Sequence, residues 1–175
     1  QTDSVRRARL DDEVLLGLRG LEPEHAARVV GLGQNISWIL LHAEPRAKAA
    51  HERAALVELE QLRPAFLRLC ALREQLGQRL QELRLAPPEQ EVAQLSQAYA
   101  AEKDLGLRFT LHQGIKQAQR KIEQQSRFVE LARHVELKLS HIEQALAQLG
   151  SQQQHGSGSG DLSRDVQGVL LHTSG

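Results

Sequence analysis

Apolar residues recur at alternating spacings of three and four in two parts of the chain, and this pattern restricts the fold more than any other feature. One stripe runs from Leu59 to Leu83 and is interrupted only by Arg73. The other runs from Phe128 to Leu149. Such spacing places apolar side chains along one face of an α-helix. The sequence therefore predicts two long helices, each with a face that must be buried.

Composition points to the same class of fold. Aromatic residues make up only 3% of the chain and methionine is absent, so leucine and alanine must fill the core. These residues, together with the abundant Gln, Glu and Arg, have high helix propensity. A length of 175 residues suits one domain. We expect an all-α fold.

The prolines mark the joints between helices, because proline removes a backbone donor and biases the preceding residue away from helical geometry. Residues 1–44 should form a cluster of short helices. Pro23 is suited to the first turn of one of them, which we expect Gly31 and Gly33 to end, and Asn35 can cap the next.

Residues 45–150 should form a long helical hairpin with its turn at residues 86–88, in "LAPPEQ". The first helix would bend or restart at Pro64. The second would run from Pro88 to Leu149 without a break.

The lengths of these helices predict how they pack. At 1.5 Å per residue they span roughly 60 Å and roughly 90 Å, so they cannot cover each other completely. An antiparallel hairpin would bring Pro45 near Val129, and the last part of the second helix would project beyond its partner. The predicted architecture is a coiled-coil-like antiparallel hairpin whose projecting end is covered by the short helices of residues 1–44.

The C-terminal part contains a strict Gly/Ser alternation, "GSGSG", within a linker predicted to be flexible over residues 151–160. Such alternation is typical of engineered spacers that join two polypeptides. Residues 161–175 would then be a tethered amphipathic helical peptide, with Asp161 as its N-cap. Its apolar face consists of Leu162, Val166, Val169 and Leu170. Because the segment is short and contains Gly168, it should need a groove to stay helical.

The linker can reach roughly 20 Å, which places this groove near the end of the last helix. Trp38, the only tryptophan, serves either as a core residue or as the interface anchor. The predicted partner-binding groove consists of Trp38, Ile39, Leu40, Leu41, Val135, Leu139, Ile142, Leu146 and Leu149.

The sequence offers no catalytic or metal-binding signature, and we expect no cofactor. A single cysteine, Cys70, permits no zinc-binding cysteine pair. Glu22 and His25 match the spacing of a di-iron motif once, where two copies are needed. His134 and His141 lie on a polar helix face that we expect to be solvated. The glycines of "GLGQN" follow no predicted strand and precede no lysine, so they do not form a phosphate loop.

Charge and hydropathy narrow the range of partners. The chain has 22 basic and 22 acidic residues, which argues against nucleic acid as a partner. The basic cluster Arg6, Arg7 and Arg9 is followed by acidic residues and is interpreted as a solvated terminus. No apolar run suits membrane insertion. The lone cysteine fits a reducing compartment, so we expect an intracellular, cytoplasmic protein, with the nucleus left open.

These observations favour a non-catalytic adaptor or scaffold subunit of a multiprotein assembly, which binds a short amphipathic helix of a partner. In composition the chain resembles subunits of cytoskeletal, kinetochore, centrosomal or vesicle-tethering assemblies, which implies a cytoskeletal or cell-division role. The alternative is a self-associating structural coiled coil, in which the last heptad stripe pairs with another copy to form a homo-oligomer. An enzyme of a helical class is the third hypothesis.

Overall fold

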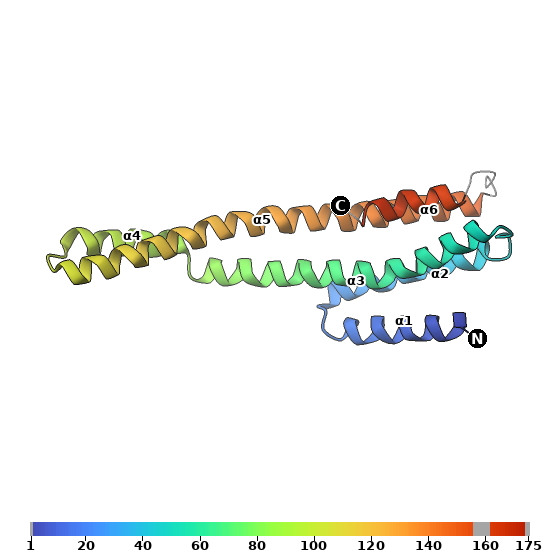
Figure 1. Cartoon of the computed structure of the whole chain (residues 1–175), viewed down its shortest axis with the longest axis horizontal. Helices are drawn as coiled ribbons and strands as arrows, with labels where there is room; N and C mark the ends of the chain where they lie inside the picture. Colours follow the sequence, from blue (N-terminus) through green and yellow to red (C-terminus); the bar gives the residue numbers. More distant parts are fainter. Residues whose placement is uncertain (1, 156–161, 174–175) are drawn as a thin grey trace. The chain divides into compact units, whose positions relative to one another are not determined.

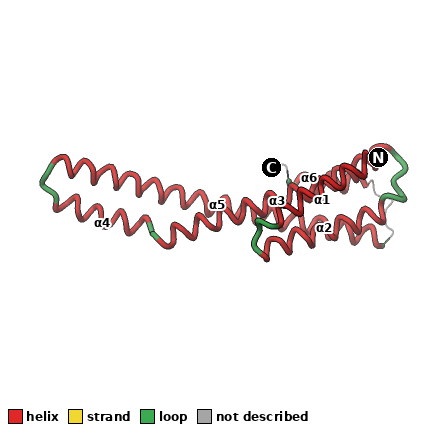
Figure 2. The backbone as a smooth tube through the Cα atoms, turned by 90° about the horizontal axis from the view of Figure 1, so that it is seen from below, coloured by secondary structure: helices red, strands yellow, loops and turns green. Residues whose placement is uncertain are grey.

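The computed structural model describes residues 2–155 and 162–173. Within these ranges the backbone consists of helices joined by short turns and contains no strand, which confirms the all-α prediction. The described helices are α1 (Thr2–Leu18), α2 (Pro23–Ala43), α3 (Ala50–Leu85), α4 (Pro88–Ala101), α5 (Leu105–Gln154) and α6 (Leu162–Leu171) (Figures 1 and 2). The chain divides into two compact units: unit 1 comprises residues 1–74 and 135–175, and unit 2 comprises residues 75–134.

In unit 2, α4 lies antiparallel to the first part of α5 (Figure 1). Lys121 Nζ lies 3.0 Å from Glu91 Oε2. The guanidinium of Arg108 lies over the ring of Tyr99, 4.5 Å from its centroid. Leu95 contacts the backbone of α5 at Gly114, where an added Cβ would come within 3.2 Å of it. The small residue at this position lets the two helices approach closely.

The chain reverses direction at residues 102–104, not at 86–88 as expected. Pro88 does begin a helix, but α4 ends at Ala101. The Asp104 side chain accepts a hydrogen bond of 2.9 Å from the backbone N–H of Leu107, as an N-cap of α5 does. Glu102 Oε1 accepts two more, from the backbone N–H groups of Lys103 and Asp104. Side-chain capping therefore ends one helix and starts the next without proline or glycine at the turn.

The later reversal changes the register between α3 and α5. In unit 2 the guanidinium of Arg79 lies 5.9 Å from the ring centroid of Phe128. In unit 1 Arg73 Nε lies 3.7 Å from Glu136 Oε2. The expectation that Pro45 lies opposite Val129 is therefore wrong, because α4 adds its own length before the chain turns back.

Helix α2 is longer, and helix α3 less interrupted, than the sequence suggests. The α2 helix passes through both Gly31 and Gly33, which were expected to end it. A glycine inside a helix costs only about 1 kcal/mol, which tertiary packing can offset. Gly33 is buried against Arg63, whose Nε would lie 3.1 Å from an added Cβ. The α3 helix likewise continues through Pro64 without restarting.

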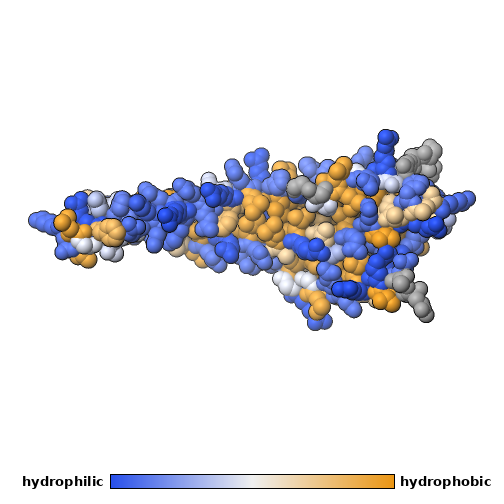
Figure 3. All heavy atoms as spheres, viewed as in Figure 1, coloured by the Kyte–Doolittle hydropathy of each residue, from blue (hydrophilic) through white to orange (hydrophobic). Residues whose placement is uncertain are grey.

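The core of unit 1 consists of aliphatic side chains from several helices. Val14 of α1 and Val29 of α2 are buried, and α3 contributes Leu59 and Phe66. The buried α5 residues in this unit are Val135, Leu139, Ile142, Leu146 and Leu149. In Figure 3, apolar atoms of unit 1 gather between α3 and α5, with polar side chains on either side. The stripe that the sequence placed on the last helix is thus covered from within the chain.

The contact between α1 and α3 depends on a glycine. A Cβ added at Gly17 would overlap the side chain of Leu67, whereas one added at Gly31 has nothing within 4 Å. We expect Gly17→Ala to lower the free energy of unfolding by about 1 to 3 kcal/mol through overpacking. Gly31→Ala should raise it by about 0.5 to 1 kcal/mol through helix propensity. Urea denaturation measures both, and equal effects of the two substitutions would contradict the close approach at Gly17.

Candidate functional site

Helix α6 lies along the last turns of α5 in unit 1 (Figure 1). Val166 and Val169 are 0% and 2% exposed, so the apolar face of α6 is covered. The opposing residues of α5, which line a shallow cavity together with α6, are Ala145, Gln148, Leu149 and Gln152. We call these α5 residues, together with the stripe Ile142, Leu146 and Leu149, the α6 seat.

The structure brings most of the predicted groove residues together at this end of α5. Val135 and Leu139 continue the buried stripe of the seat toward the middle of the helix. Trp38 and Ile39 of α2 reach the same end of α5, because a Cβ added at Gly150 would lie 4.0 Å and 3.9 Å from them. Trp38 is half-buried and stacks on His42, with 4.0 Å between ring centroids.

Leu40 and Leu41 belong to a different surface. Both line a cavity that α2 forms with α1 and α3, and they do not line the cavity at α6. On α6 itself, Leu162 and Leu170 are half-buried, unlike the two valines. The flexible linker was predicted over residues 151–160, but residues 151–154 are helical and belong to α5. Residues 156–160 and the expected N-cap Asp161 lie outside the described residues.

The C-terminal end of α6 is closed by local hydrogen bonds and contacts α5 through an aromatic pair. The Thr173 hydroxyl donates to the Leu170 carbonyl at 2.6 Å. The rings of His141 and His172 lie 5.4 Å apart between centroids. Gly168 has nothing within 4 Å of an added Cβ, so the seat itself does not require a glycine there.

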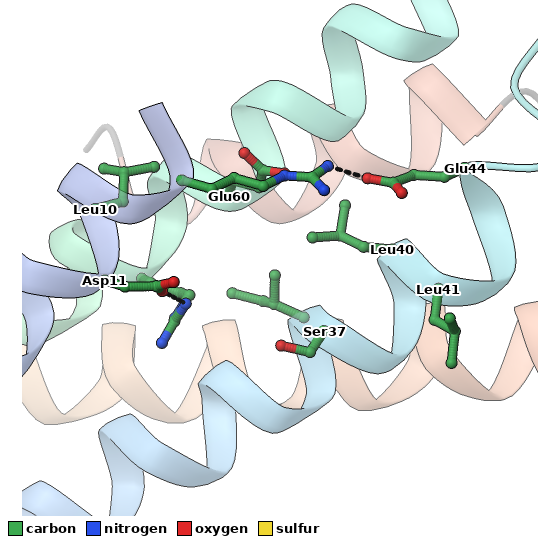
Figure 4. Close-up of a pocket in the computed structure, with 10 residues that line it drawn as sticks. Leu10, Asp11, Ser37, Leu40, Leu41, Glu44 and Glu60 are labelled. Atoms are coloured by element: carbon green, nitrogen blue, oxygen red, sulfur yellow. Dashed lines mark hydrogen bonds and ion pairs between the residues drawn. The ribbon is translucent and has the colours of Figure 1, made fainter. Parts of the chain in front are cut away.

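A second notable location is the cavity of about 290 Å³ between α1, α2 and α3 (Figure 4). Its most unusual member is Glu60, a carboxylate only 5% exposed on the apolar side of α3. Arg6 Nη2 donates to Glu60 Oε2 at 3.0 Å, and Arg7 Nε donates to Glu60 Oε1 at 2.7 Å. Arg7 also forms an ion pair with Glu44. We call this group the Glu60 cluster.

The Glu60 cluster corrects one interpretation of the sequence. Arg6 and Arg7 do not form a solvated basic terminus, because both hold a carboxylate of α3. Burial by itself lowers the pKa of Arg7, but the hydrogen bonds and charges of Glu44 and Glu60 outweigh it and raise that pKa above its ordinary value. One feature of the sequence could have predicted this cluster. Glu60 is an acidic residue directly after a core leucine, and an acidic side chain is tolerated on a buried helix face only when cationic partners lie next to it.

A further polar network joins α2, α3 and α5 within unit 1. Arg28 Nη1 donates to Glu136 Oε1 at 2.8 Å, and Arg28 also donates to Glu143. Burial acts to lower the pKa of Arg28, but these two carboxylates raise it. Cys70 is fully buried and lies near these charged groups. Desolvation raises the pKa of its thiol to about 12. The Arg28 pairs join α2 to α5, and Glu136 also lies 3.7 Å from Arg73 Nε of α3.

The candidate metal ligands of the sequence analysis either contact neighbouring helices or are exposed. Glu74 Oε1 lies 3.0 Å from His25 Nδ1 and accepts the backbone N–H of Glu22, so it caps the start of α2. His134 and His141 are both exposed. Among residues 2–155 and 162–173, no group of His, Cys, Asp and Glu side chains could hold a metal ion. In the same ranges, no helix combines the length and the apolar character that a bilayer span requires.

Comparison of the chain with protein-family models, with curated proteins and with solved structures gave no significant match.

The Glu60 cluster should contribute measurably to stability. In Glu60→Gln the buried side chain loses its charge while Arg6 and Arg7 keep theirs. We expect the free energy of unfolding to fall by about 1 to 3 kcal/mol, toward the lower end because Arg7 is half-exposed and screened by water. Glu58→Gln, at an exposed neighbouring position, is the control and should change it by less than about 0.5 kcal/mol. Urea denaturation distinguishes the two, and equal effects would show that the Glu60 pairs are energetically silent.

The Cys70 thiol should be unreactive in the folded protein. Its raised pKa leaves almost no thiolate at pH 8, and its side chain has no exposed surface. We expect a thiol reagent such as Ellman's reagent to modify Cys70 only as fast as the core opens, and rapidly in denaturant. Modification of the native protein at the rate of a free thiol would contradict the burial of this residue.

Proposed function

We propose that this protein is a non-catalytic adaptor or scaffold subunit that captures a short amphipathic helix of a partner on the last turns of α5. In this proposal α6 occupies the position of that partner helix. The composition supports an assembly of the cytoskeletal or cell-division type, working in the cytoplasm.

The observation that carries the proposal is the burial of Val166 and Val169 on the α6 seat. A ten-residue helix is too short to persist alone in water, so its helical state depends on this contact. Its apolar face is narrow, and the residues between its apolar positions include Ser163, Arg164, Asp165 and Gln167, as expected of a segment that is both soluble when free and able to dock.

The energetics fit reversible capture. Burying a valine side chain contributes roughly 1.5 to 3 kcal/mol, so the two valines supply about 3 to 6 kcal/mol before ordering costs. Such a contact is weak between separate molecules. It becomes effective when the helix is tethered, because a short linker raises its local concentration to about the millimolar range.

The same burial favours this proposal over self-association through the last heptad. The stripe from Val135 to Leu149 is already covered within one chain by α2, α3 and α6. A homo-oligomer formed through that stripe would have to displace these helices first.

Release of α6 tests the proposal. In the double variant Val166→Asp and Val169→Asp, α6 should leave its seat because two buried valines become charged. A fluorescein-labelled peptide of residues 161–173, followed by fluorescence anisotropy, should then bind this variant about tenfold or more tightly than the unmodified chain, whose seat is occupied.

The control uses an exposed position on the same helix. Leu171 is 73% exposed, so Leu171→Asp should leave the seat occupied and peptide binding as weak as in the unmodified chain. A peptide that itself carries Val166→Asp should not bind any of the chains. Equal peptide binding by the double variant and the unmodified chain would refute the proposal.

A further inference from the structure

Helix α1 buries few of its own side chains against the rest of unit 1. Among residues 3–18 only Val14 is buried. Helix α2, which is only slightly longer, has six buried residues. Two large apolar side chains of α1, Val5 and Leu16, are 69% and 67% exposed. An element with so few buried apolar contacts can open locally at a low cost in free energy.

Ion pairs supply most of the other contacts of α1. At its start, Arg6 and Arg7 belong to the Glu60 cluster. Further along, Arg63 Nη1 of α3 donates to Asp11 Oδ1 at 2.6 Å, and Arg68 Nη2 lies 3.4 Å from Glu13 Oε1. The side chains of these last two pairs are between 28% and 69% exposed. Because salt screens exposed charges, the attachment of α1 depends on ionic strength. Figure 4 shows the Glu60 cluster and Asp11 between the three helices.

The connection between α1 and α2 can act as a hinge. It consists of the four residues 19–22, which form a turn. The start of α2 is held independently of α1, because Glu74 of α3 accepts the backbone N–H of Glu22 and lies 3.0 Å from His25 Nδ1. A movement of α1 about residues 19–22 would therefore leave the start of α2 in place.

The departure of α1 would leave no charge unpaired in the core. Glu60 lines the cavity between α1, α2 and α3, so its carboxylate meets water once α1 has moved away. The ion pairs of Arg28 and Arg73, which join α2 and α3 to α5, include no residue of α1. The helices beneath α1 therefore keep their own contacts when α1 leaves.

From these contacts we propose that α1 is a detachable helix, held on unit 1 by one buried valine and a row of ion pairs. It leaves as a single unit about residues 19–22, while the rest of unit 1 stays folded. Release uncovers the Glu60 carboxylate and the side chain of Leu67, which packs against Gly17 in the docked state. The chain thus contains a conformational change controlled by charge, at a place that shares no residue with the cavity at the α6 seat.

Hydrogen exchange of the full chain, followed residue by residue by NMR, tests whether α1 opens as a unit. The backbone amides of residues 6–18 should share one opening constant. Their protection factors should be at least about tenfold lower than those of Leu62 and Phe66, which are buried in α3. Protection that rises steadily from residue 6 to residue 18 would show fraying in place of release. Protection equal to that of α3 would show that α1 opens only when the whole unit unfolds, and either result overturns the proposal.

Salt tests the ionic character of the attachment. Raising NaCl from about 0.1 M to about 1 M shortens the Debye length from about 10 Å to about 3 Å. The protection factors of the α1 amides, each referred to the unstructured chain at the same salt concentration, should fall about threefold or more. Unchanged or increased protection would mean that apolar contacts hold α1, which contradicts the proposal.

A charge exchange at Asp11 and Arg63 tests one of the ion pairs. Asp11→Arg places two like charges side by side and should lower the protection of the α1 amides about tenfold. Adding Arg63→Asp should recover at least about threefold of this loss, because the pair is restored with its charges exchanged.

Asp12→Arg is the matched control. Asp12 is exposed, and in the part of the chain that the structure describes it takes part in no ion pair. The same change of charge at this position should alter α1 protection less than about twofold. A loss as large as that in Asp11→Arg, or no recovery in the double variant, would overturn the proposal. None of these substitutions touches the α6 seat, so their outcome is independent of peptide capture there.

Discussion

The structure depends on the apolar stripe of α5, because a helix of 50 residues cannot bury one face against a single partner of ordinary length. Different helices cover successive parts of it. In unit 2 the cover is α4 and the end of α3, and in unit 1 it is α2, α3 and α6. Each part of α5 is therefore covered by helices of its own unit.

Charged residues decide how the covering helices are placed on this apolar framework. Arg28 joins α2 to two glutamates of α5, and Glu60 joins α3 to two arginines of α1. Such pairs add little net stability after desolvation, but an unpaired buried charge is very unfavourable. They therefore act mainly against alternative packings: a shift of α1 by a turn would leave the buried Glu60 carboxylate unpaired, and a shift of α2 would leave the mostly buried Arg28 guanidinium unpaired.

Much of the fold could be predicted from the sequence, because helix class and stripe positions depend on local periodicity. Pro88 was correctly placed at the start of a helix, and Leu139 and Ile142 on a buried face. The reversal at residues 102–104 was missed because Asp104 caps α5 with its side chain, and a lone aspartate is a much weaker signal than two prolines. The Glu60 cluster was missed because pairing between α1 and α3 is a tertiary event that periodicity does not contain. Leu40 and Leu41 were assigned to the end of α5 on sequence proximity to Trp38, but successive residues of a helix point in different directions.

Gly168 lines the shallow cavity between α6 and α5, and a Cβ added there would have nothing within 4 Å. The backbone flexibility of this glycine therefore matters when the segment is not docked, because it keeps the free segment from becoming helical before it binds α5. Folding and docking of α6 are then one event, and its backbone amides should exchange hydrogen with solvent whenever it leaves α5. The hydrogen-exchange protection of those amides therefore measures how often α6 leaves the α6 seat.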